Sequence, residues 1–286
     1  MRNFRSTIPA LLIAVLVLGS CSRTAERDGR PVLAVSIAPQ RTLLQAIAGS
    51  DYEVVTVLPG GTDPESYDPT PAQRRAVADA DAYFITGAFA FEQTMADALP
   101  DSAEVIDGNA GIEMIYGTHG EDVHGNIHAD PHIWMSARNM RTMAAGMAAC
   151  LARLRPDHAR IYAHRSDSLA AVIDSLDAAI AAILAGAPTH AFAVRHPSLS
   201  YFARDYGLRQ HAIGMDGKEM STSGVRRVID EARADSVAVF FVETDEQAER
   251  IASVAQGIGA RTVVVNLLDA DWQRQLQSVA HAIARP

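Results

Sequence analysis

Two stretches of alternating strand and helix patterns flank one long helical stretch, and this arrangement constrains the fold more than any other feature. From residue 137 the chain is rich in Ala, Leu and Arg at helical spacing almost to residue 184, with a break expected at Pro156. Strands are predicted before this stretch at 31–39, 52–58, 82–86 and 103–106, and after it at 190–194, 210–213, 237–242 and 262–265. Helices are predicted at 40–48, 71–80 and 91–99, and again at 199–205, 224–234, 245–257 and 271–284.

The repeated alternation predicts an α/β fold with mainly parallel sheets, in which two lobes are joined by a helix and separated by a cleft. We expect an N-terminal α/β lobe at 31–136, a linking helical segment at 137–187 and a C-terminal α/β lobe at 188–286. Thr70 and Pro71 fit the cap and the first turn of a helix. Residues 108–130 are expected to form a polar loop, because they hold Gly and His in place of an apolar pattern.

The first twenty residues have the pattern of a secretory signal peptide. Arg2 and Arg5 precede an apolar run at 8–18, which is shorter than the ~20 residues that a transmembrane helix needs. The run ends in Leu-Gly-Ser-Cys, which resembles the lipobox of bacterial lipoproteins and predicts that Cys21 carries lipid. An ordinary signal peptide and a short anchor helix are the alternatives. Residues 21–30 then form a polar tether, and Cys150 is left without a partner for an internal disulfide.

The balance of charge excludes several classes of function. The chain holds 34 acidic and 25 basic residues, for a formal charge of −9, and has no basic run in its mature part. Such a chain is a poor ligand for nucleic acid or for an anionic membrane surface. The sequence contains no Gly-x-Ser-x-Gly, P-loop or His-Glu-x-x-His pattern and no paired cysteines, so none of the common catalytic signatures is present.

Four of the ten histidines lie close together in the segment HGEDVHGNIHADPHIW. A neutral imidazole is the commonest side-chain ligand for transition metals, so His119, His124 and His128 could recruit a divalent cation. The alternative is a solvated loop whose histidines have no function. His132 differs, because the proline and tryptophan of Asp-Pro-His-Ile-Trp restrict its backbone and make it the better candidate for a fixed ligand.

Three further segments follow predicted strands, where ligands of open α/β sheets bind. Glu65 lies in the segment GGTDPESYDPTP between a strand and a helix, and His196 lies in His-Pro-Ser at an analogous place. The alternative for Glu65 is a solvated loop carboxylate. Asn266 and Asp269 follow the last strand, and Asp269 could either cap the final helix or face the cleft.

Together, the segments of the mature chain resemble the substrate-binding lipoproteins of zinc and manganese ABC transporters, the cluster A-I family. The segments that carry this resemblance are VLAVSIAPQ, ADAYFITGAFAFE, DPHIWMS, HPSLSYFARDYGL, DGKEMSTSGVRRVIDEAR and VAVFFVETDEQAERIASVAQGIGARTVVV. The resemblance implies two α/β lobes bridged by one long rigid helix. It also implies a monomer that binds a single divalent ion in the cleft and passes it to a membrane permease.

The resemblance assigns a metal site residue by residue. His132 matches the second histidine ligand of the family, and His196 matches the third ligand in its zinc form. Glu65 replaces the family's usual first histidine, and Asn266 replaces its last carboxylate. Asp269, water or a loop histidine are candidates to complete the shell. Two imidazoles and one carboxylate suit Zn²⁺, and with added water the same set could hold Mn²⁺ or Fe²⁺.

Two other functions use the same residues. A secreted zinc hydrolase would need a general base beside a His/His/Glu site, for which Glu243 and Asp216 are candidates. A surface adhesin could keep the fold without binding metal. We expect the chain to be a carrier and not an enzyme, because the sequence places no obvious general base beside the predicted ligands. The presence of His132 and His196 argues against an adhesin that binds no metal.

Overall fold

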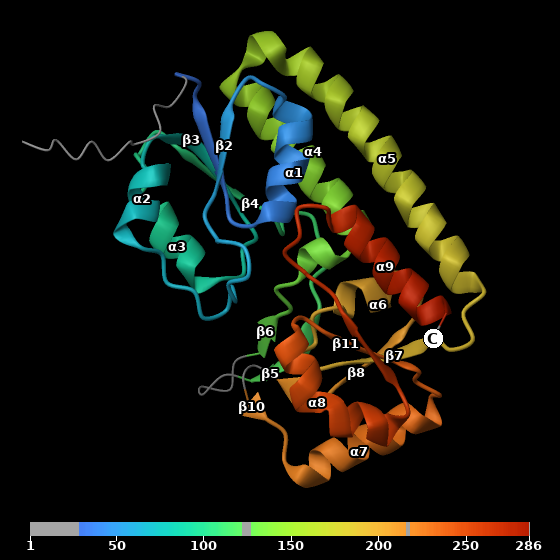
Figure 1. The fold of residues 1–286 in the computed structure, drawn as a ribbon. Helices are drawn as coiled ribbons and strands as arrows, with labels where there is room; N and C mark the ends of the chain where they lie inside the picture. Colours follow the sequence, from blue (N-terminus) through green and yellow to red (C-terminus); the bar gives the residue numbers. More distant parts are fainter. Residues whose placement is uncertain (1–28, 122–126, 216–217, 286) are drawn as a thin grey trace, which may run out of the picture. The chain divides into compact units, whose positions relative to one another are not determined.

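Two four-stranded parallel sheets form the frame of the protein in the computed structural model, which describes residues 29–121, 127–215 and 218–285. The first sheet has the order β2-β1-β3-β4 and the second the order β12-β11-β7-β8 (Figure 1). The strands of the first are β1 (Val32–Val35), β2 (Glu53–Thr56), β3 (Ala80–Ile85) and β4 (Glu104–Asp107). Those of the second are β7 (Ala191–Val194), β8 (Arg209–Ala212), β11 (Val239–Val242) and β12 (Arg261–Val264).

Both sheets have the same topology when their strands are counted along the chain: the order is second, first, third, fourth. The chain therefore changes direction across the sheet between the first and third strands, which are β1 and β3 in one sheet and β7 and β11 in the other. The connecting helices are α1 (Ala38–Ala48), α2 (Pro71–Val77), α3 (Ala90–Ala96), α6 (Ser200–Tyr206), α7 (Thr222–Ala234) and α8 (Asp245–Ile258). This confirms the predicted α/β fold with mainly parallel sheets.

Between the two sheets the chain forms the predicted long helical stretch, broken near Pro156. It consists of α4 (Ala137–Leu154), a 3₁₀ turn η2 (Pro156–His158) and α5 (Ala159–Ala185). α5 packs against α1 and α4 and also against the last helix, α9 (Trp272–Ala284), so it links the two halves (Figure 1). By length and composition Pro156–Ala185 could cross a membrane, but α5 buries Tyr162, Ile173, Leu176, Ile180 and Leu184 in the core.

Local sequence explains the main elements. The strands β1, β7 and β11 are apolar at every position and buried throughout, as expected of parallel strands covered on both faces. In the second sheet the two faces enter different clusters, since Phe192 and Val194 pack with the helices of the linking segment while Ala191 and Ala193 face a second, smaller core. At the start of α2 the Thr70 hydroxyl accepts a hydrogen bond from the backbone N–H of Gln73, which confirms the predicted cap.

The polar segment at 108–130 is not wholly a loop, contrary to the prediction. It contains an antiparallel pair, β5 (Tyr116–Glu121) and β6 (Ile127–Ala129), in which Tyr116 pairs with Ala129. Gly and His have little strand preference of their own, so backbone pairing provides the order that the side-chain pattern does not indicate. A second short pair, β9 (Gly214–Met215) and β10 (Lys218–Glu219), was also not predicted.

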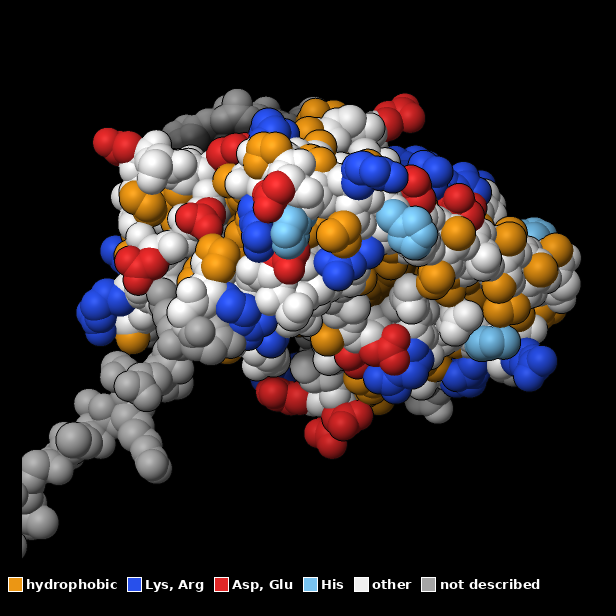
Figure 2. All heavy atoms as spheres, turned by 90° about the horizontal axis from the view of Figure 1, so that it is seen from above, with side chains coloured by type: hydrophobic (Ala, Val, Ile, Leu, Met, Phe, Trp, Pro, Cys, Tyr) orange, Lys and Arg blue, Asp and Glu red, His pale blue; other side chains and the backbone are white. Residues whose placement is uncertain are grey.

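The predicted signal peptide at 1–20 and Cys21 lie outside the described residues, and the domain boundaries at 31, 137 and 188 stay predictions. All the elements above belong to the compact unit Pro31–Pro286. On the face of the protein shown in Figure 2, acidic and basic side chains are interspersed and do not gather by sign.

Candidate metal centre

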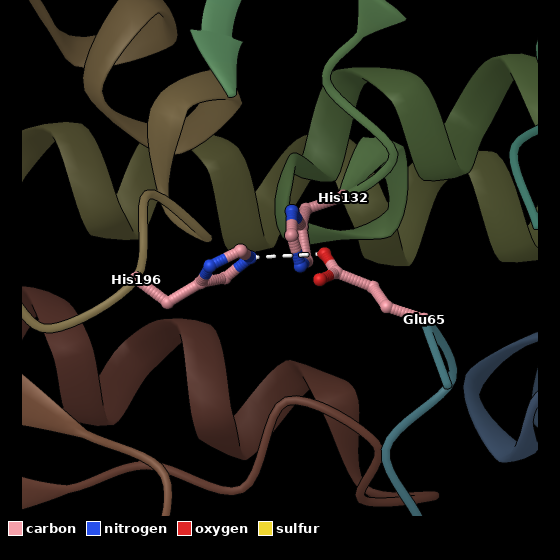
Figure 3. A group of neighbouring side chains, drawn as sticks. All are labelled: Glu65, His132 and His196. Atoms are coloured by element: carbon pink, nitrogen blue, oxygen red, sulfur yellow. Dashed lines mark ion pairs between the residues drawn. The ribbon is translucent and has the colours of Figure 1, made fainter. Parts of the chain in front are cut away.

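Glu65, His132 and His196 lie together, although they come from three separate segments of the chain. One potential ligand atom from each lies within 4.8 Å of the other two. Their side chains point toward one another, with the Glu65 carboxylate facing the His196 ring (Figure 3). The structure thus brings together all three of the predicted metal ligands.

The segment between β2 and α2 carries Glu65, and a short polar turn shapes it. The Asp63 carboxylate accepts hydrogen bonds from the Glu65 backbone N–H, at 3.0 Å, and from the Ser66 hydroxyl, at 2.9 Å. Tyr67 packs edge-on against Phe91 of α3 with ring centroids 5.2 Å apart. About a third of the Glu65 side-chain surface, 34%, stays exposed, so this ligand is the one most accessible from solvent.

Asp130 orients His132 through two hydrogen bonds. Its carboxylate accepts from the His132 backbone N–H and from the ring Nδ1, both at 3.0 Å. An ionised carboxylate only accepts, so Nδ1 carries the proton and Nε2 keeps its lone pair for a metal ion. The Thr118 hydroxyl donates to the other Asp130 oxygen at 3.0 Å. Both Asp130 and His132 are buried, which fixes the ring before any metal arrives.

The segment that carries His132 is also bonded to elements from the second half of the chain. The Tyr201 hydroxyl of α6 donates to the Asp130 carbonyl at 2.9 Å, and burial raises the pKa of Tyr201 to about 12, so it remains a neutral donor. The indole N–H of Trp134 donates to the Leu267 carbonyl at 2.8 Å. These contacts hold the buried ligand against α6 and against the turn after β12.

His196 follows β7 by two residues, at the carboxyl edge of the second sheet. Its Nε2 lies 3.1 Å from a Glu65 carboxylate oxygen, and its ring stands nearly edge-on to His132 with centroids 5.1 Å apart. Two ligand atoms that each lie ~2.1 Å from one tetrahedral zinc ion are ~3.4 Å apart. The observed separation is close to that value, so small side-chain movements suffice to admit an ion.

The three residues line one cavity of about 320 Å³. Its wall also includes Asp63, Trp134, Arg195, Glu243, Gln247 and Asn266. Glu243, one of the two general bases considered from the sequence, therefore faces the candidate site, while Asp216 lies outside the described residues.

The two sequence candidates for a fourth ligand are engaged in hydrogen bonds of their own. Asn266 lines the cavity, but its side-chain oxygen accepts a hydrogen bond from the Leu268 backbone N–H at 3.1 Å. Asp269 is not among the lining residues, because its carboxylate accepts from the Asp271 backbone and from Arg274 and Gln275. Asp271, and not Asp269, caps α9.

The loop histidines are only partly described. His124 and the side chain of His119 lie outside the described residues, and His128 is exposed at the start of the segment that leads to His132. Sequence analysis also missed one residue of the site, Asp130. Its signal was local, since an Asp two residues before a His can accept from both the backbone and the ring of that His.

Chemically, the site offers two imidazole nitrogens and one carboxylate, a set that binds a divalent cation and suits zinc well. Comparison with known proteins also indicates zinc. Residues 33–285 match the family model of ZnuA, the periplasmic component A of zinc-uptake complexes. A crystal structure of a ZnuA deletion mutant with zinc bound superimposes with a TM-score of 0.80 at 33% identity, covering 89% of this chain and 97% of that one.

Two curated relatives extend the comparison. The high-affinity zinc uptake system protein ZnuA of Bacillus subtilis is 24% identical over 91% of this chain and 85% of its own length. The zinc-binding lipoprotein AdcA of Streptococcus pneumoniae is 23% identical over 90% of this chain, but the match covers only 54% of AdcA. Since the family model spans nearly the whole described chain, this protein belongs to the family of the periplasmic component A of zinc-uptake complexes.

Proposed function

We propose that this protein is an extracytoplasmic carrier that captures Zn²⁺ and delivers it to the permease of an ABC importer. The observation that carries this proposal is the convergence of Glu65, His132 and His196, whose ligand atoms lie within 4.8 Å of one another inside one cavity. The relatives named as zinc-uptake proteins support the direction of transport. The family match to a zinc-uptake component supports a carrier over the hydrolase and adhesin alternatives, and we infer that the protein binds zinc stoichiometrically, as a monomer and without turnover.

Zinc is the preferred cargo because of the donor atoms. Two imidazoles with a single carboxylate favour Zn²⁺ over Mn²⁺, which prefers more oxygen ligands and follows zinc in the general affinity order. The same three residues hold Mn²⁺ or Fe²⁺ more weakly, with water in the remaining positions. Both rings must be neutral to bind, so acid releases the metal.

A lipid anchor at Cys21 would hold the carrier at the membrane surface near its permease. The motif Leu-Gly-Ser-Cys supports this, and the related AdcA is named as a lipoprotein. Cys21→Ser should move the protein from the membrane fraction to the soluble fraction without changing its zinc affinity. A variant that still fractionates with membranes contradicts the anchor.

The loop histidines help to capture the zinc ion and are not its primary ligands. His119, His124 and His128 precede the buried ligand His132 in the chain and add nitrogen donors near an acidic stretch. Replacing all three with Ala should slow zinc loading or weaken the affinity by less than about tenfold, which corresponds to ~1.4 kcal/mol. Complete loss of zinc binding in this variant would make the loop the primary site.

The proposal is tested by titrating metal-stripped protein with zinc in a calorimeter. A ligand that binds only the folded chain stabilises it by about 2.7 kcal/mol at one hundred times its dissociation constant. His132→Ala and His196→Ala should each remove most of this zinc-induced stabilisation. His164→Ala is the matched control, since His164 is exposed on α5. Full zinc affinity in the His132→Ala, His196→Ala double variant would refute the site and, with it, the carrier function.

A further inference from the structure

The three proposed ligands leave a bound dication short of negative charge. Glu65 supplies one carboxylate, while His132 and His196 bind as neutral imidazoles. The cavity wall also includes Arg195, whose guanidinium forms no ion pair with any described residue and adds positive charge. Uncompensated charge in a partly buried site costs binding free energy. A second carboxylate that faces the cavity is therefore expected, and this inference rests on the proposed zinc site.

The nearby acidic side chains differ in whether their oxygens are available. Both Asp63 oxygens accept hydrogen bonds within the turn that carries Glu65, so Asp63 shapes the loop. Asp269 is committed to the first turn of α9 and does not line the cavity. Neither can turn to an ion without giving up bonds that hold the local backbone.

Glu243 differs from both in position and in bonding. It is the residue that follows β11, the strand paired with β7 on one side and with β12 on the other. His196 follows β7, so His196 and Glu243 flank the place where the chain changes direction across the second sheet. In open parallel sheets this place forms a crevice outside the carboxyl ends of the strands, where ligands bind.

The backbone of Glu243 is fixed while its carboxylate is available. Its N–H donates to the side-chain oxygen of Gln247 in α8 at 3.0 Å. The side chain is half-buried, and its carboxylate forms no hydrogen bond or ion pair with the parts of the chain that the structure describes. Glu243 does not belong to the close group within 4.8 Å, so its oxygens are too far away to join the three ligands directly.

We propose that Glu243 is a fourth functional residue of the metal site, acting through water. Zinc held by Glu65, His132 and His196 keeps one coordination position for a water molecule, as three-ligand zinc sites do. The Glu243 carboxylate accepts a hydrogen bond from that water and supplies the second negative charge. It thereby holds the ion in the cavity beside Arg195 without itself becoming a ligand.

The test compares Glu243→Gln, which removes the charge and keeps the shape, with Glu249→Gln. Glu249 is exposed on α8, the helix that begins two residues after Glu243, and its substitution changes the net charge equally. Zinc dissociation constants are measured by chelator competition on metal-stripped protein at fixed ionic strength. Loss of an outer-shell partner weakens metal binding by about 10–100-fold. We expect a loss in that range for Glu243→Gln and less than about a twofold change for Glu249→Gln.

Unchanged affinity in Glu243→Gln overturns the inference. Equal losses in Glu243→Gln and Glu249→Gln also overturn it, because they would indicate a distant charge effect. Glu243→Asp keeps the charge and guards against a folding defect in the first variant. It should lose less affinity than Glu243→Gln, and an equal loss would also overturn the role. If the His132 and His196 variants lose zinc affinity but Glu243→Gln does not, the carrier function stands and only the role of Glu243 fails. The two proposals therefore fail separately.

Discussion

The two sheets of this protein share one strand order, but they differ at the crevice where the chain changes direction across the sheet. In the first sheet, between β1 and β3, the buried side chain of Gln40 fills this place. Its oxygen accepts from the backbone N–H groups of Ser36 at 3.1 Å and Ile37 at 3.3 Å, and its amide donates to the Ile85 carbonyl at 3.0 Å. One buried side chain therefore bonds three backbone groups and occupies the crevice.

In the second sheet the corresponding place, between β7 and β11, opens into the cavity of the metal centre. His196 and Glu243 follow these two strands and both line that cavity. The first sheet instead contributes Glu65 from the long segment after β2, an edge strand of that sheet. The comparison teaches that the same topology provides a crevice in each sheet, which a buried amide occupies in the first sheet and the metal centre uses in the second.

The largest effect that tests this comparison is on stability. Gln40→Ala leaves the buried Ile37 N–H without its partner, at a cost of about 1–3 kcal/mol. It also removes one hydrogen bond each, worth about 1 kcal/mol, from the Ser36 N–H and the Ile85 carbonyl, which keep the Phe84 carbonyl and the Gly108 N–H as partners. We expect the unfolding free energy of the metal-free protein to fall by about 3 kcal/mol, measured by urea denaturation. Gln247→Ala, which removes the partner of the Glu243 N–H beside the open crevice, should cost less than about 1 kcal/mol. Equal losses in the two variants would contradict the contrast.

A smaller effect concerns the ligand contributed by the first sheet. Glu65→Ala should weaken zinc binding by about 30-fold, or ~2 kcal/mol, because it removes the anionic ligand. Glu65→His restores a ligand atom and should bind zinc within about tenfold of wild type. Calorimetric titration of the metal-stripped variants gives both numbers. If Glu65→Ala binds as tightly as wild type, the first sheet contributes no ligand.

The smallest effect is a pH dependence at the opposite, amino edges of the sheets. Hydrogen bonds from His158 Nδ1, at 2.7 Å, and from the Tyr162 hydroxyl, at 2.8 Å, lower the pKa of Asp51. In the second sheet a hydrogen bond from His211 likewise lowers the pKa of Asp235. A carboxyl group with a lowered folded-state pKa stabilises the protein above its unfolded pKa, and this contribution is lost as pH falls through the folded pKa.

We therefore expect the stability of the metal-free protein to decline below about pH 4, with a shallower decline in Asp51→Asn. The measurement is the unfolding free energy from urea titrations at a series of acidic pH values. Asp235→Asn is the counterpart in the second sheet. A steeper acid decline in either variant than in wild type would reverse the predicted sign.

Most of the fold was predictable because its signals are local. The run Val239–Val242 is apolar at each position, which is typical of a strand covered on both faces, and Thr70-Pro71 starts a helix by its own chemistry. The pair β5–β6 was not predictable from its side chains, since Gly117 and its polar neighbours show no strand alternation. Pairing between backbones there depends on partners that a residue pattern does not reveal.

The site was predictable in part. His196 follows a predicted strand and His132 lies in the restrained Asp-Pro-His-Ile-Trp segment, and the structure brings both together with Glu65. The role of Gln40 was not predictable, because its hydrogen bond to Ile85 joins residues 45 positions apart. The role of Asp269 was not predictable either. Whether its carboxylate bonds to the first turn of α9 or faces the cavity depends on the backbone path of the turn at 266–269.

The bonds that fix the His132 segment have an energetic consequence. Tyr201 and Trp134 each contribute one hydrogen bond between this segment and the second half of the chain, and the hydroxyl of Ser136 adds a third to Asp205. At about 1 kcal/mol each, breaking all three costs ~3 kcal/mol. Under the proposed carrier function, a permease that separates this segment from the second half of the chain while it receives the metal would have to supply at least this free energy.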